Sequence, residues 1–200
     1  MKIGVYGGSF NPIHIGHLTV ADEVKKRLSL DKVIFIPAGY PYFKNPSDVL
    51  NYKTRKLMVE KSIKNILYFE CSDIESSETE PSYTAVTLTK LKEFYKNDEL
   101  FLIVGEDTLN VMNKWYKPEL IPQLATIVAL SRKSVKTSPI LGQYDDHNVE
   151  FQAIYLPLEI SISSSYVREQ IRSKGSYKFL VPKEAYKIIK KNKLYKQKNQ

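Results

Sequence analysis

The sequence predicts an α/β fold, a Rossmann-like doubly wound parallel sheet with helices on both faces. Two observations predict it. Short runs of consecutive apolar residues, typical of strands buried on both faces, recur along the chain. Segments with the periodicity of helices separate most of these runs. Because ligands bind beyond the carboxyl ends of the strands in open parallel sheets, we expect a site in the loops that follow the strands.

The strand segments are rich in Ile, Val, Leu and Phe, residues that suit a buried pleated surface. The first runs into Gly7-Gly8 and the second into Pro37, and both kinds of residue interrupt strands. Strands are therefore expected at residues 3–6, 33–36, 66–69, 100–104, 126–130 and 151–156.

The helical segments repeat apolar residues every three or four positions, with charged residues between them. Helices are therefore expected at residues 18–28, 52–63, 84–95, 165–173 and 183–191. Residues 38–51 and 133–149 are the longest stretches without periodicity. Long loops in compact domains are often binding loops, so both are candidates for that role.

The length and composition predict a single domain. The chain has 200 residues, 42% of them apolar, which is enough for a sizeable core. No Gly/Ser-rich or Pro-rich linker divides it. We therefore expect one domain over residues 1–200, with a C-terminal helical segment from about residue 164.

Charge and cysteine content bear on partners and compartment. The formal net charge is +8, but many of the lysines lie in residues 183–198, which suggest a helix and tail rather than a nucleic-acid groove. Cys71 is the only cysteine, so no internal disulfide or CxxC site can form. The N-terminus has no apolar signal region, and no run approaches the ~20 apolar residues of a membrane span. We expect a cytoplasmic protein, with nucleic acid an unfavoured partner and no membrane partner.

The first predicted strand runs into a segment that reads Gly-Gly-Ser-Phe-Asn-Pro-Ile-His-Ile-Gly-His, residues 7–17. Glycines let the backbone approach a ligand, and N–H groups at a helix start suit phosphate oxygens. The segment is neither a P-loop nor a dinucleotide fingerprint, because GxxxxGK[ST] and GxGxxG are absent. His14 and His17 can share one face and donate to phosphate. From spacing alone, phosphate binding, a capping or core role and metal ligation all stay open, although no nearby carboxylate or cysteine cluster completes a metal site.

A second segment, residues 162–168, reads Ile-Ser-Ser-Ser-Tyr-Val-Arg and leads into a predicted helix. The serines suit an N-cap, which is the simplest role for them. Arg168 would then lie in the first helical turn, where a cation opposes the helix dipole by about 0.3–1 kcal/mol. Arg172, one turn later, adds like-charge repulsion. An anion at the helix start would remove this conflict, so Arg168 is a candidate phosphate ligand.

The two segments carry a family resemblance. His14-Ile15-Gly16-His17, together with the residues before it, resembles the GxFxPxHxGH signature of the HxGH nucleotidylyltransferase superfamily. Residues 162–168 resemble the ISSTxxR motif of the same superfamily, with Ser165 in place of Thr. The resemblance implies the HxGH nucleotidylyltransferase fold and an enzyme that uses ATP.

Three further elements resemble those of bacterial nicotinate mononucleotide adenylyltransferases: Pro81-Ser82-Tyr83-Thr84, Gly105-Glu106-Asp107 and Trp115-Tyr116. The resemblance extends from Lys2 to about Tyr195. Pro41-Tyr42-Phe43-Lys44 stands where that family has Pro-Pro-His-Lys, so the lysine is kept and the histidine is not. The resemblance implies transfer of AMP from ATP to nicotinate mononucleotide, forming deamido-NAD and pyrophosphate in NAD biosynthesis.

The resemblance also implies roles for individual residues. Catalytic residues would be His14, His17, Lys44 and Arg168. ATP-binding residues would be Gly8, Ser9, Phe10, Gly16, Arg132, Ile162, Ser163 and Ser164. Acceptor-binding residues would be Tyr83, Thr84, Gly105, Asp107, Trp115 and Tyr116. Taken alone, Trp115 can equally be a core aromatic and Lys44 a solvated loop lysine.

The implied mechanism needs no protein nucleophile. The acceptor phosphate would attack the α-phosphorus of ATP in line, and catalysis would rest on positioning and charge stabilisation. Mg²⁺ would accompany ATP, and no metal site built from side chains is expected.

Two alternatives stay open. One keeps the chemistry but changes the acceptor to nicotinamide mononucleotide or another small phosphorylated molecule. The other is a non-catalytic nucleotide- or RNA-binding module, which the basic charge alone favours and which predicts salt-sensitive binding. The sequence leaves a homo-oligomer open as well.

Overall fold

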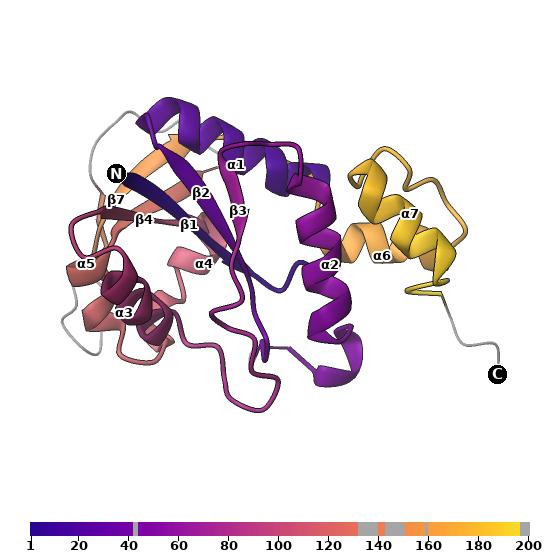
Figure 1. The fold of residues 1–200 in the computed structure, drawn as a ribbon, viewed down its shortest axis with the longest axis horizontal. Coiled ribbons are helices and arrows are strands. Elements are labelled where there is room, and N and C mark those ends of the chain that lie inside the picture. Colours follow the sequence, from indigo (N-terminus) through magenta and orange to yellow (C-terminus); the bar gives the residue numbers. More distant parts are fainter. Residues whose placement is uncertain (42–43, 132–139, 143–150, 159, 197–200) are drawn as a thin grey trace.

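The computed structural model describes residues 1–41, 44–131, 140–142, 151–158 and 160–196. Within them, seven strands form one sheet in the order β3-β2-β1-β4-β5-β7-β6 (Figure 1). The strands are β1 (Lys2–Gly8), β2 (Lys32–Pro37), β3 (Phe69–Cys71), β4 (Glu99–Gly105), β5 (Thr126–Ser131), β6 (Ile140–Gly142) and β7 (Phe151–Pro157). All neighbouring strands pair in parallel except β6, which is antiparallel to β7. The strand order reverses between β1 and β4, where doubly wound sheets bind ligands.

Helices cover both faces of the sheet. They are α1 (Ile15–Leu28), α2 (Tyr52–Ile63), α3 (Thr84–Phe94), α4 (Glu106–Leu109), α5 (Ile121–Leu124), α6 (Ser164–Arg172) and α7 (Lys183–Lys191). Short 3₁₀ helices span Pro46–Asp48, Met112–Lys114 and Pro118–Leu120. The side chains of β2 alternate between two cores: Val33 and Phe35 pack with α1 and α2, and Ile34 and Ile36 pack with α3 and α5. This alternation is why a continuous apolar run forms a strand here.

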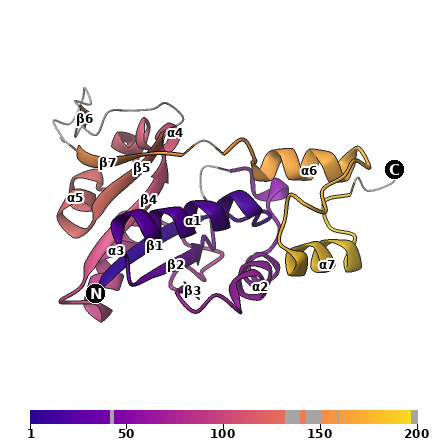
Figure 2. The ribbon, with the colours of Figure 1, turned by 90° about the horizontal axis from the view of Figure 1, so that it is seen from above.

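The two C-terminal helices pack on the core that α1 and α2 share. Val167 and Ile171 of α6 and Ala185 and Ile189 of α7 are buried in that cluster. Figure 2 shows α6 and α7 side by side, beyond the N-terminal end of α1. The N–H of Ile15 donates to the carbonyl of Leu180 at 3.0 Å, so the C-terminal segment is tied to the start of α1.

Most expected elements are confirmed, and α2 and α7 have the predicted bounds. The third strand was placed wrongly: it spans Phe69–Cys71, because residues 66–68 form a turn after α2 in which Leu67 is 99% exposed. The turn is closed by hydrogen bonds from Ile66 to Ile63 and from Phe69 to Ile66. The predicted doubly wound parallel sheet is confirmed, and it carries one further strand: β6, inside the stretch expected to be a loop, pairs antiparallel to β7 at the edge. None of the helices in the described part of the chain is long and apolar enough to span a bilayer.

Candidate active site

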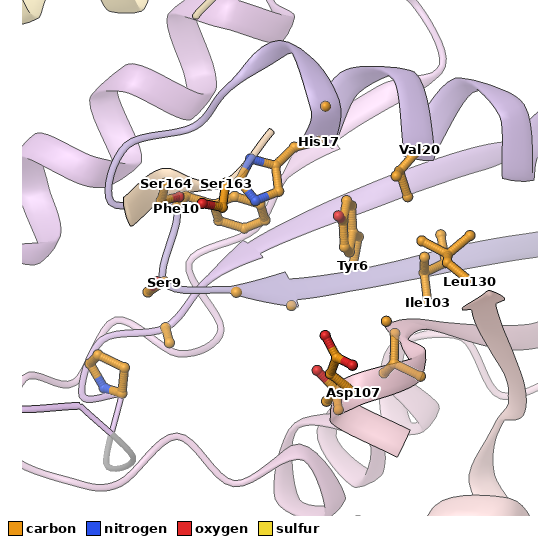
Figure 3. Close-up of a pocket in the computed structure, with 18 of the residues that line it drawn as sticks. Tyr6, Ser9, Phe10, His17, Val20, Ile103, Asp107, Leu130, Ser163 and Ser164 are labelled. Atoms are coloured by element: carbon orange, nitrogen blue, oxygen red, sulfur yellow. The ribbon is translucent and has the colours of Figure 1, made fainter. Parts of the chain in front are cut away.

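A cavity of about 610 Å³ lies at the carboxyl ends of the central strands, a size typical of small-molecule sites. Fourteen of the predicted site residues line it: Gly8, Ser9, Phe10, His14, Gly16, His17, Lys44, Thr84, Gly105, Asp107, Trp115, Ile162, Ser163 and Ser164. Figure 3 shows His17 of α1 with Ser163 and Ser164 on one side of the strand ends and Asp107 of α4 on the other. The cavity therefore has a histidine and serine end and a carboxylate end.

Three predicted residues do not line this cavity. Tyr83 and Tyr116 stack on each other, with ring centroids 4.5 Å apart and planes at 24°. Arg168 lies beside the cavity and donates a hydrogen bond to Ser165, which lines it. The predicted ATP ligand Arg132 lies outside the described residues.

The two histidines form a stacked pair at the start of α1. Their ring centroids are 3.6 Å apart with planes at 25°, and the backbone N–H of His14 donates to Nδ1 of His17 at 3.1 Å. Because Nδ1 of His17 accepts that bond, the neutral ring carries its proton on Nε2. Gly16 permits the close packing, since a Cβ there would lie 2.7 Å from Cγ2 of Ile160 and 3.0 Å from Nδ1 of His14.

Two aromatic rings pack against the ring of His17. Phe10 is buried and meets His17 edge-on at 4.9 Å, and Tyr6 meets it at 6.0 Å. The backbone of Phe10 has φ of 42°, a left-handed conformation that costs free energy in a non-glycine residue. The packed ring of Phe10 offsets this cost.

Burial favours the neutral form of both imidazoles. Desolvation lowers the pKa of His14 to about 4. Desolvation lowers the pKa of His17 as well, and the positive charge of Lys44, and of His14 when it is protonated, lowers it further. A bound polyanion would oppose these effects, because negative charge favours the protonated imidazole.

This depressed pKa predicts an acid-sensitive stability. The unfolded chain protonates His14 near its ordinary value of 6.5, whereas the folded chain does not until about pH 4. Its stabilising contribution is therefore present above pH 6.5 and is lost as the pH falls toward 4. Urea unfolding of wild type and His14→Asn, at pH 7 and pH 5, should give a difference in unfolding free energy that changes by about 2 kcal/mol. A difference that does not change with pH contradicts a neutral, buried His14.

The second motif caps α6 and reaches back to the first motif. Ser163 is the N-cap, and its Oγ accepts the N–H of Tyr166 at 3.1 Å. The hydroxyl of Ser164 donates to the carbonyl of Pro12 at 2.8 Å. Arg168 is the fifth residue of α6 and not part of its first turn, because the helix begins at Ser164 and not at Ser165. The expected conflict with the helix dipole is therefore weaker than the sequence suggested.

Arg168 nevertheless points toward the first motif. Its Nη1 donates to the carbonyl of Asn11 at 2.8 Å and its Nη2 to Oγ of Ser165 at 3.1 Å. Its Nε is buried without a partner among the described residues, and so is Nδ1 of His14. A buried polar atom without a hydrogen bond costs about 1–3 kcal/mol. Two such atoms next to one cavity indicate a binding site for a polar ligand.

Lys44 completes a positive region. Its Nζ donates to Oγ of Ser9 at 2.7 Å. Burial lowers the pKa of Lys44, and the positive charges of Arg168 and Arg55 lower it further. Lys44 and Arg168, with the starts of α1 and α6 beside them, suit a ligand with several negative charges.

The cavity lining also includes residues that the sequence did not single out. Glu75 and Ser82 line the cavity together with Thr84, Asp107 and Trp115. The hydroxyl of Thr87 donates to Oε1 of Glu75 at 2.6 Å, and burial raises the pKa of Glu75. Glu75 lies in an acidic loop, and the sequence alone does not distinguish it from the solvent-exposed carboxylates around it.

The described residues contain no group of three or more His, Cys, Asp or Glu side chains that could hold a metal ion. The cations and helix starts at one end can instead hold phosphates. The ring of Trp115 can stack on a flat heterocycle at the other end. The site can therefore bind two linked or neighbouring groups, one a polyphosphate and one an aromatic ring.

Comparisons with known proteins agree with this chemistry. Residues 5–170 match the model of the cytidylyltransferase-like family. Two relatives, each named "Probable nicotinate-nucleotide adenylyltransferase", come from Dehalococcoides mccartyi BAV1 and Clostridium botulinum Alaska E43. The first is 40% identical over 199 residues, covering 98% of this chain and 97% of the relative. The second is 40% identical over 200 residues, covering 98% of each.

A solved structure has the same fold. A nicotinic acid mononucleotide adenylyltransferase of Plasmodium falciparum in complex with NaAD has a TM-score of 0.75 at 21% identity, covering 97% of each chain. A second structure of that enzyme, in complex with APC, has a TM-score of 0.73 at 21% identity, covering 97% of this chain and 96% of that one. The matches in sequence reach across both motifs and both ends of the cavity, and this chain belongs to the cytidylyltransferase-like family, within its nicotinate-nucleotide adenylyltransferases.

Proposed function

We propose that this chain transfers AMP from ATP to nicotinate mononucleotide, forming deamido-NAD and releasing pyrophosphate. One observation carries the proposal: a single cavity joins a cationic end, suited to phosphates, to an end lined by Trp115 and carboxylates. The names of the full-length relatives support this activity.

At the cationic end, His17 would act where negative charge develops. Its Nε2–H, fixed by the bond that Nδ1 accepts, would donate to an α-phosphate oxygen. His14 and Arg168, each with an unpartnered buried nitrogen, would hold neighbouring phosphate oxygens. The N–H groups at the start of α6 lie beside Ser163 and Ser164 and would add to the same binding.

At the other end, the pyridine nucleotide would place its ring near Trp115. The pyridinium ring is cationic, and both an aromatic face and nearby carboxylates favour a cation. Pantetheine phosphate has neither a ring nor a positive charge, so these residues favour a pyridine nucleotide over it.

The step itself would be a displacement at phosphorus. An oxygen of the acceptor phosphate forms a bond to the α-phosphorus as the bond to the β-phosphate oxygen breaks, and pyrophosphate leaves with that electron pair. Lys44 would hold the acceptor phosphate against the α-phosphate. Magnesium enters as part of the substrate, the magnesium complex of ATP, whose phosphate oxygens supply ligands. We treat residues 1–200 as one catalytic domain, because α6 contributes serines to the same cavity as α1. A free, half-buried Cys71 fits a reducing cytoplasm.

A pyrophosphate-release assay tests the proposal. The purified chain would be given ATP with nicotinate mononucleotide, nicotinamide mononucleotide or pantetheine phosphate, and then CTP in place of ATP. We expect kcat/KM for nicotinate mononucleotide to exceed that for nicotinamide mononucleotide by at least about tenfold, as the names of the full-length relatives indicate.

Product analysis by mass would identify deamido-NAD. Faster release with another acceptor would reassign the substrate. Binding of RNA without any release of pyrophosphate would favour the non-catalytic module instead.

A further inference from the structure

Arg55 of α2 is a buried cation that the chemistry above does not use. Its side chain is 1% exposed, yet none of the ion pairs among the described residues involves its guanidinium. Each of its three nitrogens instead donates to one backbone carbonyl: Nε to Leu50 at 2.7 Å, Nη1 to Ser9 at 2.8 Å and Nη2 to Gly39 at 3.2 Å. Burying a charge is costly unless it is hydrogen-bonded in this way, so the arrangement calls for a reason.

The three carbonyls belong to two loops of the site. Ser9 follows β1 and lines the cavity. Gly39 and Leu50 lie near the two ends of the segment that carries Lys44, which we call the Lys44 loop (described residues 38–41 and 44–51). One guanidinium therefore joins both ends of the Lys44 loop to Ser9, in the loop that follows β1.

The Lys44 loop and the loop after β1 also meet through the side chains of Lys44 and Ser9. Nζ of Lys44 donates to Oγ of Ser9 at 2.7 Å, while the carbonyl of Ser9 accepts from Arg55. Ser9 is thus held from both sides. In a trans peptide the N–H points opposite to the carbonyl, so fixing the Ser9 carbonyl on Arg55 also fixes the direction of the Phe10 N–H.

We propose that Arg55 is a positioning residue for AMP transfer, which anchors both ends of the Lys44 loop to Ser9 and so sets where Lys44 stands relative to the phosphates. The proposal rests on the function proposed above for the role of Lys44. Only a planar fork can reach three carbonyls that lie in different directions, and a lysine ammonium at that depth would reach fewer of them. A purely structural contact at this place could be apolar and would not need a buried charge.

A double-mutant cycle with Lys44 tests the proposal. Arg55→Lys should lower kcat/KM by about 10- to 100-fold in the otherwise wild-type chain. In a Lys44→Ala background the same change should lower it less than about threefold, because the loop then carries no group to position. Equal losses in both backgrounds overturn the proposal.

A second measurement does not depend on the reaction. Trypsin should cleave after Lys44 at least about tenfold faster in folded Arg55→Lys than in wild type, relative to cleavage after Lys178 in the same sample. Ile63→Ala, a core truncation near the end of the same helix, serves as the control for general loss of stability. It should change neither the cleavage ratio nor kcat by more than about threefold.

Should Arg55→Lys fail to fold, Arg55→Gln takes its place in both measurements. An unchanged cleavage ratio in a folded Arg55 variant overturns the anchoring role, whatever the acceptor is. If the wild-type chain transfers AMP to no acceptor, the proposed function fails, and the cleavage ratio alone decides whether Arg55 anchors the loop.

Discussion

His17→Ala is expected to lower kcat by about 10²–10³, the loss measured when one donor to a developing oxyanion is removed. The reason is geometric. The N–H of His14 occupies Nδ1 of His17, and burial keeps the ring neutral, so Nε2 is its donor toward the cavity. Alanine cannot supply that donor, while the amides and cations that bind ground-state phosphates stay in place.

Steady-state kinetics with ATP and nicotinate mononucleotide, alongside circular dichroism and thermal unfolding, would measure this effect. The KM for ATP should change less than kcat, because the contact strengthens as charge develops. His17→Gln is the matched variant, since its amide N–H can reach close to the position of Nε2 and should recover part of the rate. A folded His17→Ala enzyme that turns over within about fivefold of wild type rules out this role.

Gly39→Ala is expected to lower the melting temperature by roughly 2–12 °C. A Cβ on Gly39 would lie 2.0 Å from the carbonyl oxygen of Ser77 and 2.2 Å from that of Glu75. Both are backbone atoms, so whole segments must move, and overpacking of this kind costs about 1–3 kcal/mol. For a chain of this length each kcal/mol shifts the melting temperature by about 2–4 °C.

The same change should alter the site. Gly39 also accepts a hydrogen bond from Arg55, and Glu75 lines the carboxylate end of the cavity. We therefore expect the KM for nicotinate mononucleotide to rise more than the KM for ATP.

Gly7→Ala is the matched control for stability. A Cβ on Gly7 meets nothing within 4 Å, and alanine in a strand is favoured over glycine by about 0.5–1 kcal/mol. Its melting temperature should be unchanged or slightly higher. Equal losses in the two variants would mean that loss of a glycine, and not the clash at Gly39, is the cause.

Local sequence signals predicted the parts of the fold that are decided locally. The apolar run of β2 ends at a proline and α2 begins after the capping residue Asn51, so both segments have clear ends, and the structure has both. The strand predicted at residues 66–69 was wrong despite its apolar composition, because turn hydrogen bonds hold this segment and leave Leu67 exposed. The edge strand β6 was not predicted, because three residues carry too little pattern to indicate a strand or its pairing partner.

The site divides in the same way. Motif residues such as His17 and Ser163 lie on short segments at helix starts, where spacing along the chain largely decides their positions. Tyr83 and Tyr116 also matched a motif, but their rings stack on each other away from the cavity lining. Whether a ring faces a cavity or another ring depends on neighbours that are distant in sequence.

The sequence by itself determined the α/β class, the two motifs and their positions after strands. Only the tertiary structure decided that Arg55, an ordinary helix residue in the sequence, is buried against three carbonyls, and that Glu75 lines the cavity. The physical reason is that hydrogen bonds between residues 16 to 46 positions apart depend on how β1, β2 and α2 pack, which no local pattern encodes.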